Sequence, residues 1–300
     1  MMHVTVLYNP EAGDDSLDEG ELRVLLKNAG HSATYHSTKA NGWKTALDEP
    51  GDLVVVAGGD GTVAKVARRL AGRAVPMALL PAGTANNIAR SLGFEGHPET
   101  LVERWMTARA TPVDLGIVDG PMGERCFVEG TGLGVFPELM VQSPHRISKE
   151  MPTSEQIQLN LELMMELLER AKPVSCQVSA DGRDLSGAYL VLELMNIRSI
   201  GPRIVFSPDA DPTDGLLEIV AITEADRKMT IDFLRRSQNE DAGLFELPCV
   251  RAKSIQLAWK TEPVHVDDER WPAEEHYHRD EDAIFSARVT VKPGAFEVLF

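Results

Sequence analysis

Two short segments rich in glycine and threonine have the residue types and spacing to bind a phosphate group. The first joins an apolar run to an expected helix and consists of Gly58, Gly59, Asp60, Gly61 and Thr62. Glycine lets the backbone approach phosphate oxygens without a Cβ clash and adopt a positive φ. The following helix offers free N–H groups and the positive end of its dipole. Asp60 is expected to act through a metal ion or a ribose hydroxyl. A tight turn that binds nothing is the alternative.

The second segment, PAGTANN at residues 81–87, follows the next apolar run and also opens an expected helix. Because neighbouring parallel strands bring their carboxyl ends to one edge of a sheet, the two segments together predict a nucleotide or phosphate site. The chain contains neither GxxxxGK[ST] nor GxGxxG, so the pattern is not that of a P-loop enzyme or a dinucleotide-binding fold.

The elements that must position these segments alternate between strand and helix through residues 1–113. Apolar, β-branched runs predict strands at 3–8, 52–57, 75–80 and near residue 113, and helical spacing predicts helices at 17–29, 62–71 and 99–108. This alternation predicts an α/β, doubly wound nucleotide-binding domain with its ligands at the carboxyl ends of the strands.

Residues 114–300 follow a different pattern, in which short strands alternate with Asp-Gly turns. Strands are expected at 254–259, 264–266, 287–291 and 296–300, and one strong helix at 154–171. The apolar stripe of that helix favours core packing over a lipid-binding groove. We expect a β-rich C-terminal domain, a sandwich or open barrel, with a cleft between the two domains and a chain end that can return to the first.

The composition limits the partners and the location of the protein. A net charge of −16 argues against a nucleic-acid partner, and the three cysteines are too widely spaced for a disulfide framework or a structural zinc site. The first residues lack the pattern of a signal peptide, and no apolar run approaches the roughly 20 residues that cross a bilayer. A cytoplasmic protein is expected, with peripheral contact at the inner membrane face.

Several segments resemble the signatures of the diacylglycerol kinase catalytic domain family, which includes bacterial lipid kinases, sphingosine kinases and ceramide kinases. They are LYNPEAG, VVVAGGDGTVAKVA, LLPAGTANNIARSLG, FVEGTGLGVFPE, NIRSIGPRIVFSPDADPTDGLLEIV, VHVDDERWP and VKPGAFEVLF. GGDG also occurs in NAD kinases and phosphofructokinases, but its combination with PxGTxN and PDAxxxDGLL is specific. The resemblance implies an ATP-dependent kinase that phosphorylates a hydroxyl of a diacylglycerol-like or sphingoid-like lipid.

The resemblance also implies which residues bind the nucleotide. Asn9, Gly13 and Thr38 are implied to line the nucleotide pocket, and the loop of residues 58–62 and Thr84 to hold the phosphates. A Mg²⁺ ion is expected to accompany ATP and to neutralise the charge that develops during phosphoryl transfer.

Asp267 and Glu269 match the acidic segment of the family near the C-terminus. The resemblance implies that they supply the general base that takes the proton of the lipid hydroxyl. Residues two apart on a strand share a face, so both carboxylates are expected to point into one cleft, where their proximity raises the pKa of one of them. A solvated acidic loop is the alternative.

A second magnesium site is implied at a tight Asp-Gly turn. Its ligands are Asp211, Asp214 and the carbonyl of Leu216. Oxygen ligands suit a hard cation such as Mg²⁺. A turn stabilised by its own aspartate side chains, without a metal, is the alternative.

Three departures from the family pattern keep other hypotheses open. Ala64 and Lys65 replace the usual Asn-Glu pair, Asn87 stands where aspartate is common, and Asp268 replaces a glycine. The alternatives are an NAD-kinase-like small-molecule kinase and a non-catalytic nucleotide- or lipid-binding regulator. The sequence does not identify the lipid and leaves a homodimer open.

Overall fold

The computed structural model describes residues 1–13, 16–120, 123–148, 150–238, 243–245, 247, 249–260, 262–271 and 284–299. The chain divides into two compact units: the first comprises Met1–Val113 and Pro293–Phe300, and the second Asp114–Lys292. Both boundaries lie inside strands, β5 (Ala110–Gly120) and β19 (Ile284–Leu299). Each of these strands therefore contributes residues to both units.

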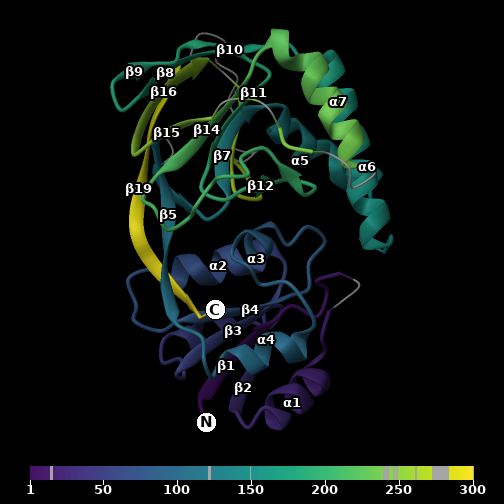
Figure 1. The fold of residues 1–300 in the computed structure, drawn as a ribbon, viewed down its shortest axis with the longest axis vertical. Coiled ribbons are helices and arrows are strands. Elements are labelled where there is room, and N and C mark those ends of the chain that lie inside the picture. Colours follow the sequence, from purple (N-terminus) through teal and green to yellow (C-terminus); the bar gives the residue numbers. More distant parts are fainter. Residues whose placement is uncertain are drawn as a thin grey trace. The chain divides into compact units, whose positions relative to one another are not determined.

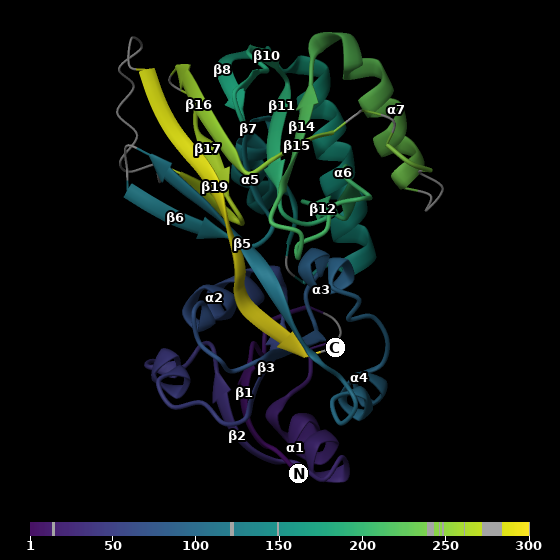
Figure 2. The ribbon, with the colours of Figure 1, turned by 60° about the vertical axis from the view of Figure 1, so that its left-hand side comes forward.

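The first unit is built on a parallel sheet with the strand order β19-β4-β3-β1-β2 (Figure 1). Its own strands are β1 (His3–Tyr8), β2 (Ser32–Ser37), β3 (Leu53–Gly58) and β4 (Met77–Pro81). Its helices are α1 (Glu19–Asn28), α2 (Asp60–Leu70), α3 (Asn87–Ser91) and α4 (Pro98–Arg104), with a 3-10 helix, η1 (Trp43–Leu47). Figures 1 and 2 place α1 and α4 on one side of the sheet and α2 on the other. The predicted doubly wound α/β class is confirmed.

Local sequence accounts for most of these elements. β3 is buried along its whole length, as its LVVVAG sequence predicts for a strand covered on both faces. α1 begins with a capping box in which the side chains of Asp18 and Glu21 each accept a backbone N–H of the other residue. The sequence does not predict β2, because this edge strand has no continuous apolar run.

The order of the strands changes direction between β1 and β3. The chain moves from β1 to β2 on one side, and then to β3 and β4 on the other side of β1. In open α/β sheets, ligands bind at the carboxyl ends of the strands at such a switch point. The loops that follow β1 and β3 both begin there.

The second unit contains two facing sheets. One, which we call the helix-covered sheet, has the order β15-β14-β11-β7-β17-β18; the opposing sheet runs β10-β8-β16-β19, with β5, β6 and β9 attached. The strands are β6 (Gly123–Phe127), β7 (Gly130–Gly134), β8 (Val174–Ala180), β9 (Arg183–Asp184), β10 (Gly187–Tyr189), β11 (Val191–Met195), β14 (Leu217–Ile222), β15 (Val250–Ala252), β16 (Ser254–Lys260), β17 (Val264–Val266) and β18 (Glu269–Trp271), with a separate hairpin of β12 (Ser199–Ile200) and β13 (Ile204–Val205). Buried side chains of both sheets, including Phe127, Leu133 and Val178, form the core between them. The predicted β-sandwich is confirmed.

Three helices in the described part of the second unit pack on the other face of the helix-covered sheet, where the sequence predicts only one. They are α5 (Val135–Arg146), α6 (Thr153–Arg170) and α7 (Arg227–Ser237), with a 3-10 helix, η2 (Glu224–Asp226). The expectation of one helix is wrong because α5 contains Pro144 and five of the eleven residues of α7 are charged, which obscures their apolar faces. The stripe of α6 packs into a core with Phe136 and Phe206. No helix among the described residues is long and apolar enough to cross a membrane.

Candidate active site

The two glycine-rich turns of the first unit lie in direct contact. A Cβ atom added to Gly83 would lie only 2.4 Å from the Cα of Gly59, and one added to Gly59 would lie 2.9 Å from the Cα of Gly83. The N–H of Ala82 donates to the carbonyl of Gly58 at 3.2 Å, which ties the ends of β3 and β4 together. The two turns therefore form one continuous backbone surface at the edge of the sheet.

Close approach, and not an unusual backbone conformation, requires these glycines. Gly58, Gly59 and Gly83 do not have a positive φ, so that part of the sequence argument is wrong for them. The left-handed residue of this region is Asn86, with φ of 55°. Its side chain accepts the N–H of Gly83 at 2.8 Å and donates to the carbonyl of the same residue at 2.7 Å. Asn86 thus closes the second turn.

Asp60 joins the two turns through a hydrogen bond. Its Oδ1 accepts the N–H of Ile88, the second residue of α3, at 2.9 Å. This contact shows a structural role for the carboxylate beside the expected one toward a metal ion or ribose. α2 begins at Asp60 without a side-chain cap on its N-terminus. An uncapped helix end presents backbone N–H groups and a positive dipole, which favour an anion.

The other predicted nucleotide residues lie at the same sheet edge. The N–H of Asn9 donates to the carbonyl of Ala57 at 2.9 Å, and the N–H of Thr38 donates to that of Tyr8 at 2.8 Å. Gly13 has φ of 113°, a conformation that favours glycine. Thr84 is half-buried in the second turn. The structure therefore brings together the ends of β1, β2, β3 and β4, which can line one nucleotide pocket.

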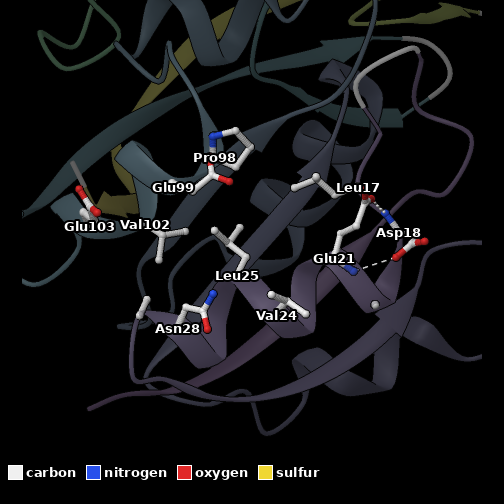
Figure 3. Close-up of a pocket in the computed structure, with 12 residues that line it drawn as sticks. Leu17, Asp18, Glu21, Val24, Leu25, Asn28, Pro98, Glu99, Val102 and Glu103 are labelled. Carbon is white, nitrogen blue, oxygen red and sulfur yellow. Dashed lines mark hydrogen bonds between the residues drawn. The ribbon is translucent and has the colours of Figure 1, made fainter.

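A hollow elsewhere in the first unit does not suit a nucleotide. This groove, of about 690 Å³, lies between α1 and α4, and its walls include Leu25, Val102, Glu21, Glu99 and Glu103 (Figure 3). The carboxylates would repel a triphosphate. The residues that line it include none of the predicted nucleotide-binding residues. This groove therefore offers no alternative to the glycine turns as a candidate phosphate site.

In the second unit, Asp267 lies in a hairpin turn and Glu269 begins the strand that follows it. β17 ends at Val266, which pairs with Glu269 at the start of β18. Asp267 is in the turn itself with φ of 51°, while Asp268 has no such positive φ. The expectation that both carboxylates share one face of one strand is therefore wrong, because the chain reverses direction between them.

The two carboxylates have different surroundings. Oδ1 of Asp267 accepts the backbone N–H groups of Val128 at 3.0 Å and Glu129 at 2.8 Å, and the residue is only 4% exposed. Glu269 is exposed. Backbone N–H donors stabilise an ionised carboxylate. Asp267 therefore holds the turn from inside the protein, whereas Glu269 is exposed to solvent.

Three buried polar residues that the sequence analysis does not single out surround this turn. His265 and Glu193 form a pair at 2.8 Å. The side-chain Nδ2 of Asn196 donates to the carbonyls of Asp114 and Val128, each at 3.1 Å. In the sequence, each of these residues interrupts an otherwise apolar run. His265 lies in VHV, and Glu193 and Asn196 lie in LELMN.

The predicted magnesium turn is already stabilised by its own side chains. Oδ1 of Asp211 accepts the N–H and the hydroxyl of Thr213, at 3.0 and 2.7 Å. Asp214 accepts the N–H of Leu216 at 2.9 Å and forms an ion pair with Arg251. Asp214 therefore has a cationic partner where a metal was expected. These contacts fit the aspartate-stabilised turn that the sequence leaves open as the alternative to a Mg²⁺ site.

Among the residues that the structure describes, no group of three or more His, Cys, Asp or Glu side chains is arranged to hold a metal ion. The Asp-Gly turn is instead anchored by Asp114, which is 1% exposed and accepts the N–H of Gly215 through its Oδ2 at 2.7 Å.

Two of the residues that depart from the family pattern, Ala64 and Asn87, are buried, which leaves little room for a polar ligand contact there. Ala64 is 1% exposed on the inner face of α2, and Lys65 is exposed on its outer face. Asn87 is 2% exposed at the start of α3. The backbone contacts between the glycine turns do not involve these side chains.

Comparisons with known proteins agree with this arrangement. Residues 3–118 match the model of the diacylglycerol kinase catalytic domain, and residues 145–300 match that of the YegS C-terminal NAD kinase beta sandwich-like domain. A diacylglycerol kinase of Bacillus subtilis is 27% identical over 236 residues, which cover 75% of each chain. A Cronobacter sakazakii protein named "Probable lipid kinase YegS-like" is 26% identical over 227 residues, 73% of each chain.

A solved structure supports the fold. A crystal structure of a diacylglycerol kinase from Bacillus anthracis aligns with a TM-score of 0.70 over 99% of this chain and 96% of that one, at 20% sequence identity. At this identity the likeness supports the architecture alone. The family models and the relatives favour the kinase hypothesis over a non-catalytic regulator.

Proposed function

Because the chain belongs to the diacylglycerol kinase catalytic domain family and is a kinase, we propose that it transfers the γ-phosphate of ATP to a hydroxyl of a diacylglycerol-like or sphingoid-like lipid. The observation that carries this proposal is the contact of Gly59 with Gly83. It unites two helix-opening turns into one surface that can follow a polyphosphate chain.

The first unit binds the phosphate donor in this proposal. Asn9, Gly13 and Thr38 line the nucleotide side, and the loop of residues 58–62 with Thr84 holds the phosphates. Backbone N–H groups at the uncapped start of α2 supply positive potential without a flexible side chain. Mg²⁺ enters as part of the MgATP substrate and neutralises charge on the phosphates.

The second unit activates the acceptor, with Glu269 as the general base. The lipid hydroxyl oxygen bonds to the γ-phosphorus while the bond from that phosphorus to the β–γ bridging oxygen breaks, which releases ADP. The hydroxyl proton passes to the Glu269 carboxylate. Asp267 keeps the turn in place through its bonds to the N–H groups of Val128 and Glu129.

The lipid substrate implies a peripheral encounter with the inner face of the membrane from the cytoplasm, because a long-chain acceptor resides in the bilayer. The net charge of −16 opposes a nucleic-acid partner. A homodimer is compatible with the proposal, and the chemistry assigned to the two units does not require one.

The proposal is tested by incubating the purified protein with radiolabelled ATP, Mg²⁺ and micelles of diacylglycerol or sphingosine. We expect a labelled phospholipid from the wild-type protein. Glu269→Gln should lower kcat by about 10²- to 10⁴-fold, the usual contribution of a general base. Asp268→Asn, which neutralises the exposed neighbouring carboxylate, is the matched control and should retain activity.

Two results would contradict the proposal. Full activity of Glu269→Gln would exclude Glu269 as the base. Wild-type protein that binds ATP and yields no labelled lipid from any acceptor, including a total bacterial lipid extract, would exclude a lipid kinase.

A further inference from the structure

A buried acid and a buried histidine bridge three neighbouring strands of the helix-covered sheet. In the strand order β11-β7-β17 (Figure 2), Glu193 pairs in register with Gly132, and Gly132 pairs with His265. Both ionisable side chains are 0% exposed, and Oε2 of Glu193 lies 2.8 Å from Nε2 of His265. The pair therefore spans the middle strand inside an apolar core.

The middle strand makes room for the pair. A Cβ atom added to Gly132 would lie 2.3 Å from Cδ of Glu193. Any larger residue at position 132 would displace that carboxylate. The ring of His265 also packs 5.9 Å from the ring of Phe136 on α5, which limits its rotation. The two side chains are thus confined to one geometry by the strands around them.

The pair is connected to the turn that carries the proposed base. Nδ1 of His265 donates to the backbone carbonyl of Asp267 at 3.0 Å. The backbone of the same strand is held by the hydroxyl of Thr131, which donates to the carbonyl of His265 at 2.6 Å. Because a carbonyl only accepts, Nδ1 carries a hydrogen, and a further proton is shared between Nε2 and Glu193.

We propose that Glu193 and His265 are positioning residues, which fix the turn at Asp267 and thereby orient the Glu269 carboxylate toward the lipid hydroxyl. The inference rests on the proposed role of Glu269 as the base. Neither residue touches the substrate in this scheme. They act through the backbone of the turn.

Stability alone is a weak reason to keep such a pair. Removing two ionisable groups from water is costly, and apolar residues of similar size in the same place are often equally stabilising or better. A purely structural pair could therefore be replaced by apolar residues without loss. A pair that sets the geometry of the turn could not, because His265 supplies a donor to the Asp267 carbonyl that an apolar side chain lacks.

The test compares single and double variants by kcat, by KM for ATP and by thermal stability. Glu193→Leu should lower kcat by about 10- to 100-fold, the usual cost of losing a supporting hydrogen bond in a site, with KM for ATP unchanged. Glu193→Gln should retain kcat, because its amide can donate to Nε2 while Nδ1 still donates to the turn. Val220→Ala, next to Glu193 on β14, is the control for destabilisation and should keep wild-type kcat.

The double variant Glu193→Leu/His265→Phe separates positioning from stability. It removes the buried polar groups and keeps an aromatic ring beside Phe136, so we expect a thermal midpoint at or above that of the wild-type protein, with kcat still lowered. If Glu193→Leu does not fold, this variant carries the same test. Wild-type kcat in the double variant, or a loss in Glu193→Gln equal to that in Glu193→Leu, would overturn the inference. In either case, an inactive Glu269→Gln would leave the proposed function standing.

Discussion

Replacing Gly83 by alanine tests whether the two glycine turns form the nucleotide site. The added Cβ would lie 2.4 Å from the Cα of Gly59, whereas carbon atoms pack at about 3.5 Å, so the two turns must separate by about 1 Å. The same methyl group would also lie 3.0 Å from Oδ1 of Asn86, which closes the turn. The contact with Gly59 pushes the second turn away from the first, and the contact with Asn86 distorts the second turn itself.

A displacement of this size should be visible in catalysis. Misplacement of a substrate by about 1 Å can cost about 10²-fold in rate, which equals about 2.7 kcal/mol of transition-state stabilisation. We therefore expect Gly83→Ala to lower kcat/KM for MgATP by about 100-fold at a saturating lipid concentration. Initial rates measure this directly, and titration with a fluorescent ATP analogue shows how much of the loss is in binding.

Gly72→Ala is the control for the general cost of a glycine substitution. Gly72 has φ of 80° with open space around its Cα, and it follows the opposite end of α2. This variant should lose about 1 kcal/mol of stability through backbone strain and keep its affinity for ATP. A folded Gly83→Ala protein with wild-type ATP affinity would refute the argument, because the triphosphate could not then lie across the two turns.

Three further predictions concern the second unit. Asp267→Asn should lower the free energy of unfolding by about 1–3 kcal/mol, because its amide group would face backbone N–H donors; an unchanged urea midpoint would contradict this. Chelation of divalent cations should leave the thermal midpoint of the nucleotide-free protein unchanged, because Arg251 already neutralises Asp214. A fall of several degrees would instead support a bound metal ion at the turn of Asp211 and Asp214. Burial lowers the pKa of His265, but the charge and hydrogen bond of Glu193 outweigh it and raise the pKa overall. Since the folded protein then keeps a proton that the unfolded chain releases, stability should fall as the pH rises above the ordinary value of 6.5 toward the raised pKa. Urea unfolding across this range should show no such slope in Glu193→Leu/His265→Phe.

The sequence is sufficient to predict that the two glycine turns lie at one edge of the sheet, because its signals are local. Each glycine turn follows a continuous apolar strand and opens a helix, and parallel strands bring such turns to one edge. The contact of Gly59 with Gly83 is the consequence of that arrangement. The reason that glycine is needed is not visible in the sequence, because the close approach is a tertiary contact between segments 24 positions apart.

The acceptor half depends on pairings that one sequence does not reveal. Treating residues 267–269 as one strand placed both carboxylates on a common face, and the hairpin between β17 and β18 separates them. The Glu193–His265 pair needs the register of three strands to be known. The role of Arg251 likewise depends on the pairing of β15 with β14, which places it beside Glu218 in the same ladder.

The two halves therefore differ in how substitutions affect them. The donor turns are shaped by backbone contacts, so the changes at Ala64 and Asn87 alter side chains and leave the Gly59–Gly83 surface intact. The acceptor turn is shaped by side chains, since Asp267 and His265 each hold it through a specific hydrogen bond. Departures from the family pattern are consequently compatible with ATP binding, whereas the choice and turnover of the lipid should be sensitive to changes around the β17–β18 hairpin.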